Sequence, residues 1–147
     1  MEWGYVIGLL GVGLCVLLCG IGSALGLKKT GQAAAGILSE DPKKFSKALV
    51  LVVLPATQGI YGFVFGIIAM GSVTAGMTVG AGFQVLLAGL PLALTGFFSA
   101  MFQGGTAASC IHAVAKKESL SGKLILFPAM VETYAILALV ISILLIA

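Results

Sequence analysis

The sequence contains no arginine, and charged residues make up only 9% of its 147 residues. A soluble domain carries roughly 25% charged residues, so this scarcity excludes an ordinary soluble protein. Hydrophobic residues account for 60% of the chain, and the mean hydropathy is +1.18. We therefore expect a single membrane domain over residues 1–147.

The sequence also lacks the patterns of several other protein classes. Its eight lysines lie in two short polar regions without interleaved aromatic residues, which argues against nucleic-acid binding. It has no phosphate-binding loop of the required pattern, so we expect no ATP hydrolysis by this chain. Cys15, Cys19 and Cys110 all lie in apolar runs, and we interpret them as small buried side chains. No cofactor is expected.

Four apolar runs are long enough to cross a bilayer as helices, which takes about 20 residues each. They comprise residues 4–27, 48–70, 84–115 and 121–147. Because lipid offers no hydrogen-bond partners, these runs predict an all-α membrane protein with four transmembrane helices. No basic segment precedes the first run, which we interpret as a retained span and not as a signal peptide.

The distribution of lysine predicts the orientation in the membrane. All eight lysines lie in or beside the first and third connections, residues 28–47 and 115–123, whereas the second connection has no charge. Cytoplasmic loops carry the excess of lysine, so we expect these two connections in the cytoplasm and both termini outside. A turn near Pro42 predicts that the first two helices project from the bilayer. Their tips are either ordinary solvated loops or a docking surface for a soluble partner.

The chain contains an internal repeat. Residues 54–61 (LPATQGIY) align with residues 127–134 (FPAMVETY) at an offset of 73, whereas Ser23 aligns with Ser99 at an offset of 76. We interpret the difference of three residues as a shorter loop in the second half. A duplicated helical pair is the simplest origin of such a pattern.

The repeat predicts two tandem helical hairpins, residues 1–74 and residues 75–147. The second hairpin carries Glu132, which aligns with Gly59 in the first hairpin. Glu132 is also the one acidic or basic side chain expected at bilayer depth, where a charge costs at least roughly 2.5–3.5 kcal/mol. No intramembrane lysine or arginine is available to pair with it. Glu132 is therefore a candidate functional residue.

Polar residues of two other helices are expected at the level of Glu132. Four residues of the second helix follow the i, i+3, i+4, i+7 spacing of a single face: Leu54, Thr57, Gln58 and Tyr61. On the third helix, Ser99, Gln103 and Thr106 share a face. Gln58, Gln103 and Glu132 each lie about 17 Å from the cytoplasmic helix ends at 1.5 Å per residue. The sequence thus predicts one polar cluster built by three helices.

Such a cluster offers a carboxylate, two amide carbonyls and a hydroxyl, with no soft ligand. Pro55 and Pro128 disturb the preceding helical turns and free a backbone carbonyl as a further oxygen ligand. These oxygens suit a hard monovalent cation or a proton on Glu132, because a divalent ion usually needs more carboxylates. Tyr61 is expected to donate a hydrogen bond to Glu132. Hydrogen bonding between helices alone is the alternative interpretation of the amide side chains.

The sequence resembles the duplicated, four-helix proteolipid subunit of V-type rotary ATPases over nearly its whole length. The resemblance is most specific in residues 54–63 (LPATQGIYGF) and 130–136 (MVETYAI), and it favours the bacterial sodium-pumping branch. It implies that Glu132 carries the ion and that Tyr61 hydrogen-bonds its carboxylate. The implied sodium ligands are the side chains of Thr57, Gln58 and Gln103 and the backbone carbonyl of Leu54.

The resemblance further implies a non-catalytic subunit that forms a homo-oligomeric ring in a bacterial cell membrane. The expected partners are identical chains, a stator membrane subunit with a fixed positive charge, and a soluble central stalk at the hairpin tips. The transported ion is expected to be Na⁺, with H⁺ as the alternative. A small four-helix, proton-coupled multidrug exporter is an alternative of another class, but such exporters typically carry their glutamate in the first helix.

Overall fold

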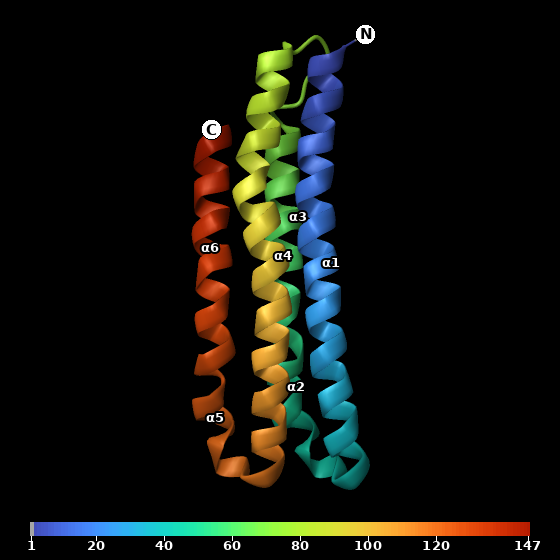
Figure 1. Ribbon diagram of the computed structural model, residues 1–147, viewed down its shortest axis with the longest axis vertical. Helices are drawn as coiled ribbons and strands as arrows, with labels where there is room; N and C mark the ends of the chain where they lie inside the picture. The colour runs from blue at the N-terminus through green and yellow to red at the C-terminus, as the bar shows by residue number, and fades with distance from the viewer. Residues whose placement is uncertain (1) are drawn as a thin grey trace.

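The structure, a computed structural model, describes residues 2–147 and contains no strand among them. The helices form four long rods (Figure 1). Two rods are single helices, α1 (Trp3–Glu40) and α4 (Val79–Lys116). The remaining two rods are interrupted, and they consist of α2 (Phe45–Val53) with α3 (Thr57–Met70) and of α5 (Ser121–Leu124) with α6 (Leu126–Ile146). Short 3-10 turns lie at Pro42–Lys44, Leu54–Ala56 and Glu118–Leu120.

All four rods are long and apolar enough to span a membrane, which confirms the predicted all-α membrane fold. With their 3-10 turns included, they measure 38, 29, 38 and 29 residues in chain order. The alternation of long and short rods repeats the duplication seen in the sequence. The chain therefore consists of two tandem helical hairpins, while the predicted boundary between residues 74 and 75 stays a prediction.

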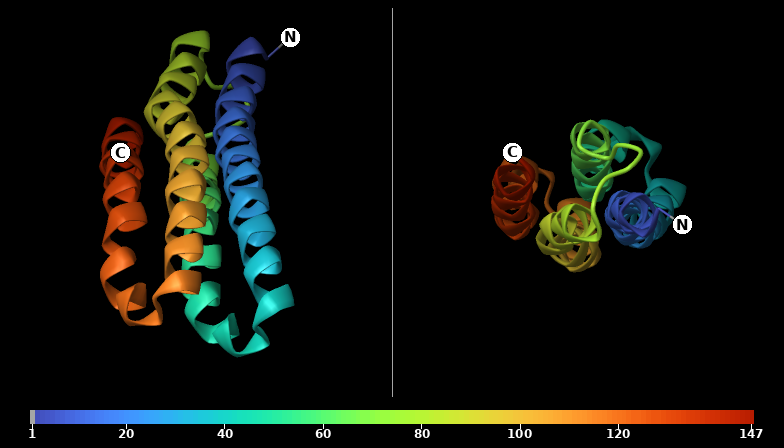
Figure 2. Two further views of the ribbon diagram at one scale, coloured as in Figure 1. Left: turned by 60° about the horizontal axis from the view of Figure 1, so that its bottom comes forward. Right: turned by 90° about the horizontal axis from the view of Figure 1, so that it is seen from above.

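Viewed along the rods, α1 and α4 stand side by side, α3 packs against both of them, and α6 flanks α4 (Figure 2). Small residues permit this close packing, as expected for helices in lipid. A Cβ atom added to Gly26 of α1 would lie 2.5 Å from the carbonyl oxygen of Ala100 in α4. One added to Gly104 would lie 2.4 Å from the Cα of Gly26. The backbones of α1 and α4 thus meet without intervening side chains.

Pro55 interrupts the second rod near its middle. Because proline has no N–H, the regular helical ladder loses a hydrogen bond at this position. The chain forms the Leu54–Ala56 turn instead, in which the Leu54 carbonyl accepts a hydrogen bond from the Thr57 N–H. Just before this turn, the buried hydroxyl of Thr30 in α1 donates to the Val52 carbonyl at 2.9 Å. The backbone oxygens around Pro55 are therefore available to side-chain partners.

The predicted shorter loop in the second half is wrong. A single residue separates each long helix from the next 3-10 turn: Asp41 after α1 and Lys117 after α4. The difference of three residues lies inside the second rod of each hairpin. Pro55 comes 11 positions after the turn residue Lys44, whereas Pro128 comes 8 positions after Leu120. An alignment offset counts residues and does not distinguish those in a loop from those in a helix.

The lysine-bearing connections lie together at the end of the molecule opposite to the start of α1 and the end of α6 (Figure 1). Lys44 Nζ donates to the Ala115 carbonyl at 2.9 Å, and Lys47 forms an ion pair with Glu118. These contacts join the tips of the two hairpins. Pro42 opens the second rod as predicted, at the start of a 3-10 turn capped by the Asp41 side chain.

Candidate functional site

The predicted polar cluster is assembled between α3, α4 and α6. Gln58, at the start of α3, and Gln103, in the middle of α4, have no solvent-exposed surface. The Gln58 Nε2 donates to Gln103 Oε1 at 2.8 Å, and the Gln103 Nε2 donates to Glu132 Oε2 at 3.2 Å. The two amides and the carboxylate therefore form one continuous chain of hydrogen bonds across three helices.

Glu132 receives a hydrogen bond on each carboxylate oxygen. The hydroxyl of Tyr61 in α3 donates to Oε1 at 2.5 Å, and the Nε2 of Gln103 donates to Oε2. Hydrogen bonds to an ionised acceptor are shorter and stronger than neutral ones, so this pair of donors suits a charged carboxylate. The ion pairs of residues 2–147 lie at the hairpin tips, and none involves Glu132. The carboxylate is thus held in place without a counter-charge from the described part of the chain.

Further oxygen atoms lie at the turn around Pro55, beside this chain of hydrogen bonds. The Thr57 Oγ1 lies 2.9 Å from the Leu54 carbonyl oxygen, to which it donates, and 3.3 Å from Gln58 Oε1. Three oxygens from different functional groups therefore lie together on the inner side of the second rod. Residues 2–147 hold no cluster of three or more His, Cys, Asp or Glu side chains of the kind that bind transition metals. The single carboxylate among neutral oxygens fits a hard monovalent cation better than a divalent one.

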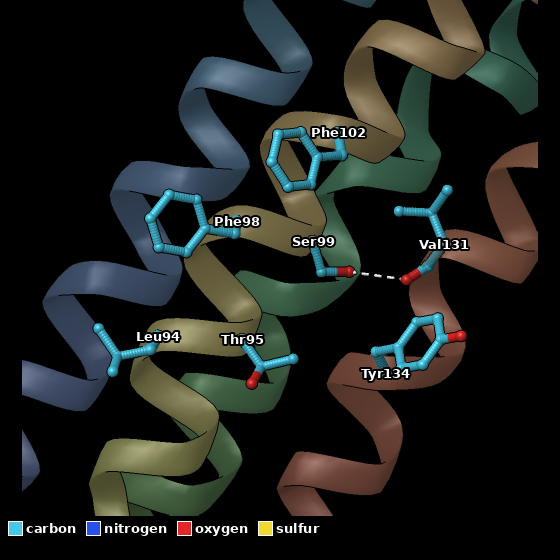
Figure 3. Close-up of a pocket in the computed structure, with 7 residues that line it drawn as sticks. All are labelled: Leu94, Thr95, Phe98, Ser99, Phe102, Val131 and Tyr134. Atoms are coloured by element: carbon cyan, nitrogen blue, oxygen red, sulfur yellow. Dashed lines mark hydrogen bonds between the residues drawn. The ribbon is translucent and has the colours of Figure 1, made fainter.

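Ser99 also belongs to the cluster, although the sequence prediction of the site left it out. Its Oγ accepts from Gln58 Nε2 at 3.2 Å and donates to the Val131 carbonyl at 3.0 Å (Figure 3). The i, i+4 spacing of Ser99 and Gln103 was the available signal. Thr106, which was expected on the same face, instead donates to the Phe102 carbonyl of its own helix at 3.1 Å.

The position of the first hairpin that aligns with Glu132 is occupied by Gly59 and is tightly packed against α1. A Cβ added to Gly59 would lie 3.1 Å from the Ser23 Oγ of α1, which already accepts a hydrogen bond from the Gly59 N–H at 2.8 Å. A side chain there would require the serine to shift by a few tenths of an ångström. Because position 59 carries no carboxylate, the cluster around Glu132 has no counterpart in the first hairpin.

Two segments of the chain, residues 10–69 and 86–145, each match the family model of the ATP synthase C subunit. The matches cover most of the chain and fall on the two hairpins. The chain belongs to the ATP synthase C-subunit family. The resemblance to proteolipid subunits of rotary ATPases is thereby confirmed, and this membership accounts for the duplicated hairpin.

Individual relatives indicate the class of ATPase to which this family member belongs. The V-type sodium ATPase subunit K of Enterococcus hirae is 46% identical over 143 residues, covering 97% of this chain and 92% of its own. The A-type ATP synthase subunit K of Methanocaldococcus jannaschii is 40% identical, covering 95% of this chain and 61% of its own. The 16 kDa proteolipid of the V-type proton ATPase of Rattus norvegicus is 25% identical, with 98% and 93% covered. The chain is thus a non-catalytic, multi-pass membrane subunit of the V/A-type ATPase class.

Proposed function

We propose that this protein carries Na⁺ across the membrane on Glu132, as part of a ring of identical chains that rotates against a stator. The observation that supports this most directly is the composition of the cluster. Within residues 2–147, a single half-buried carboxylate, held by Tyr61 and Gln103, lies among neutral oxygens and forms no ion pair with a cationic side chain. The 46% identical relative is named as a sodium ATPase subunit, which favours sodium as the ion.

The bound ion supplies the missing counter-charge. A lone carboxylate at bilayer depth is costly, whereas a carboxylate paired with one monovalent cation is neutral overall. The proposed ligands are the Glu132 carboxylate, the side chains of Thr57, Gln58 and Gln103, and the Leu54 carbonyl. In this state the site passes through lipid at modest cost. At the stator the ion leaves, and a fixed positive charge of the stator subunit stabilises the exposed carboxylate.

The internal repeat supports assembly into a ring. Three glycines of α1 press against the backbone or side chains of α4 and its neighbours: Gly11, Gly22 and Gly26. Their equivalents 76 positions later are Leu87, Phe98 and Phe102, whose exposed fractions are 58%, 48% and 61%. Two of them, Phe98 and Phe102, line a groove of about 430 Å³ between α4 and α6 (Figure 3). The face that is covered in the first hairpin is left open in the second.

The matching open face lies on α1. Gly89 and Gly96 of α4 make close contacts in the core of the chain, and their equivalents in the first hairpin are Gly13 and Gly20. A Cβ added at either of these positions would meet nothing within 4 Å. The open faces of α4 and α1 are therefore the repeat counterparts of two faces that contact each other within the chain, with large side chains on α4 in place of the glycines of α1. A contact between different faces of identical chains closes into a ring when its rotation permits.

The remaining partners follow from the two ends of the molecule. The tips formed by residues 28–47 and 115–123 carry all eight lysines, and we place them in the cytoplasm with both termini outside a bacterial cell membrane. There they form the surface on which a soluble central stalk docks. Hydrolysis of ATP in other subunits turns the stalk and brings successive sites to the stator.

The experiment that tests sodium binding is labelling of Glu132 with a hydrophobic carbodiimide at constant pH, with and without Na⁺. Sodium should protect the carboxylate, and the purified ring should bind radiosodium. If neither happens while the ring is intact, sodium transport is excluded and the same rotor carrying H⁺ becomes the better hypothesis. The proton alternative has its own support, because a 25% identical relative is named as part of a proton ATPase.

A further inference from the structure

Ser99 lies at a branch point of the cluster. Its side chain, which is only 5% exposed, bridges α3 and α6 through Gln58 Nε2 and the Val131 carbonyl. The view in Figure 3 shows the serine of α4 pointing across the groove to the α6 backbone. Ser99 makes no hydrogen bond to Glu132, and it is connected to the carboxylate through the two glutamine amides and through the backbone of the neighbouring Val131.

The hydrogen bond to Val131 determines what Ser99 offers to Gln58. A backbone carbonyl accepts hydrogen bonds and never donates, so the Ser99 hydroxyl must give its one proton to the Val131 oxygen. Only lone pairs of the serine then remain for Gln58. The end of the Gln58 amide that faces Ser99 must therefore be the NH₂ group, whichever way the amide is drawn.

The Pro128 carbonyl determines the orientation of the Gln103 amide in the same way. It accepts from Gln103 Nε2 at 3.0 Å, so the NH₂ end of that amide also faces α6. The Gln103 Oε1 is then directed at Gln58 and accepts from its Nε2 at 2.8 Å. With both of its N–H groups engaged, Gln58 turns its oxygen toward Thr57 Oγ1, 3.3 Å away, beside the Leu54 carbonyl.

We propose that Ser99 is a positioning residue for cation binding, which orients the Gln58 amide so that its oxygen, and not its NH₂ group, faces the bound ion. This inference rests on the proposed sodium function and extends it to a residue that is not itself a ligand. Without the serine hydroxyl, one N–H of Gln58 loses its acceptor, and the reversed amide would present two donors to a cation. The effect should therefore fall on cation binding and leave proton binding to Glu132 in place.

The test compares Ser99→Ala with Ser99→Thr, which keeps the hydroxyl at a position that lines the open groove. Ser142→Ala is the matched control, because Ser142 is a buried serine that accepts from the Leu92 N–H at 3.3 Å in another part of α6. Two quantities are measured on intact rings. One is the Na⁺ concentration that half-protects Glu132 from a carbodiimide, and the other is the pH dependence of labelling without Na⁺.

We expect Ser99→Ala to raise the half-protecting Na⁺ concentration about tenfold, in the range expected for one lost hydrogen bond. Its pH dependence without Na⁺ should match that of the unsubstituted ring. Ser99→Thr should restore protection, and Ser142→Ala should leave it unchanged. Equal protection in Ser99→Ala and the unsubstituted ring would overturn the proposal. So would a similar loss in Ser142→Ala, or a changed labelling profile without Na⁺, since either would indicate a general packing defect. If the unsubstituted ring itself is not protected, the sodium function fails and the positioning role fails with it.

Discussion

Replacing Glu132 with glutamine removes the charge of the cluster and keeps its shape. The amide oxygen of the substituted side chain would accept from Gln103 Nε2, which now lies 3.2 Å from Glu132 Oε2. Its NH₂ group would donate to the Tyr61 oxygen, because a hydroxyl accepts as readily as it donates. No buried polar group is left without a partner. We therefore expect Glu132→Gln to fold and to form rings of the normal size.

The cost of the substitution is electrostatic. Two unit charges about 4 Å apart attract each other by about 4 kcal/mol at an effective dielectric constant of about 20. A loss of that size weakens binding about a thousandfold. The ion pairs of residues 2–147 involve Asp41 and Glu118 at the hairpin tips, so no second carboxylate in the described chain replaces the lost charge. Sodium binding by Glu132→Gln should thus fall about a thousandfold.

Radiosodium binding to purified rings and sodium transport by the whole ATPase measure this effect. Glu118→Gln is the matched control, because it removes an exposed carboxylate that pairs with Lys47 and lies far from the cluster. The control should bind sodium like the unsubstituted ring. Sodium affinity within tenfold of normal in Glu132→Gln would refute the role assigned to the carboxylate. Normal coupled transport by that variant would refute it as well.

Three further substitutions test other parts of the structure. Tyr61→Phe removes one of the two hydrogen-bond donors to Glu132. The half-protecting Na⁺ concentration in the carbodiimide assay should then rise roughly tenfold, as for the loss of one charge-assisted hydrogen bond. An unchanged concentration would exclude a role of Tyr61 in holding the carboxylate for ion binding. Gly20→Leu places a side chain at a position where an added Cβ meets nothing within 4 Å, and it should break rings into monomers that native mass spectrometry detects. The control Gly36→Leu, equally open but near the tip, should leave the rings intact. Intact Gly20→Leu rings would contradict the assembly inferred from the repeat. Gly26→Val forces a side chain against the α4 backbone. It should therefore lower the thermal unfolding midpoint of the chain by several degrees at least. A midpoint within one degree of normal would contradict the close contact between α1 and α4.

Periodicity and composition were sufficient to predict the four helices and their pairing into hairpins. Long apolar runs have few alternatives in lipid, and the repeat fixed which helices correspond. The internal break of the second rod was harder to predict. Pro55 indicated a disturbance, but the Leu54–Ala56 turn also depends on partners from another helix, such as the Thr30 hydroxyl on the Val52 carbonyl. Contacts of that kind have no signal in local sequence.

The members of the cluster were predictable because depth and helical face can both be counted from the sequence. The structure brings Gln58, Gln103 and Glu132 together with Tyr61, as the counting predicted. Their identity as ion ligands stays a prediction. The place of Ser99 on the face of Gln103 was predictable from helical spacing, but its bridging role was not, because that role depends on the Val131 carbonyl of another helix. Helical spacing specifies the face of a side chain and not the partner that its hydroxyl selects.

The tight contact at Gly59 has a consequence for energy conversion. In the proposed ring, each chain contributes four helices to the circumference but only one ion per revolution. A carboxylate at Gly59 would double that number, yet a Cβ atom there would lie 3.1 Å from the Ser23 Oγ of α1, which is tighter than an ordinary contact. Because fewer ions cross per turn, the same ATP-driven rotation can push each of them against a steeper gradient. In the proposed ring, the close packing of α3 on α1 at Gly59 therefore disfavours the second carboxylate that would raise the ratio of transported ions to ATP.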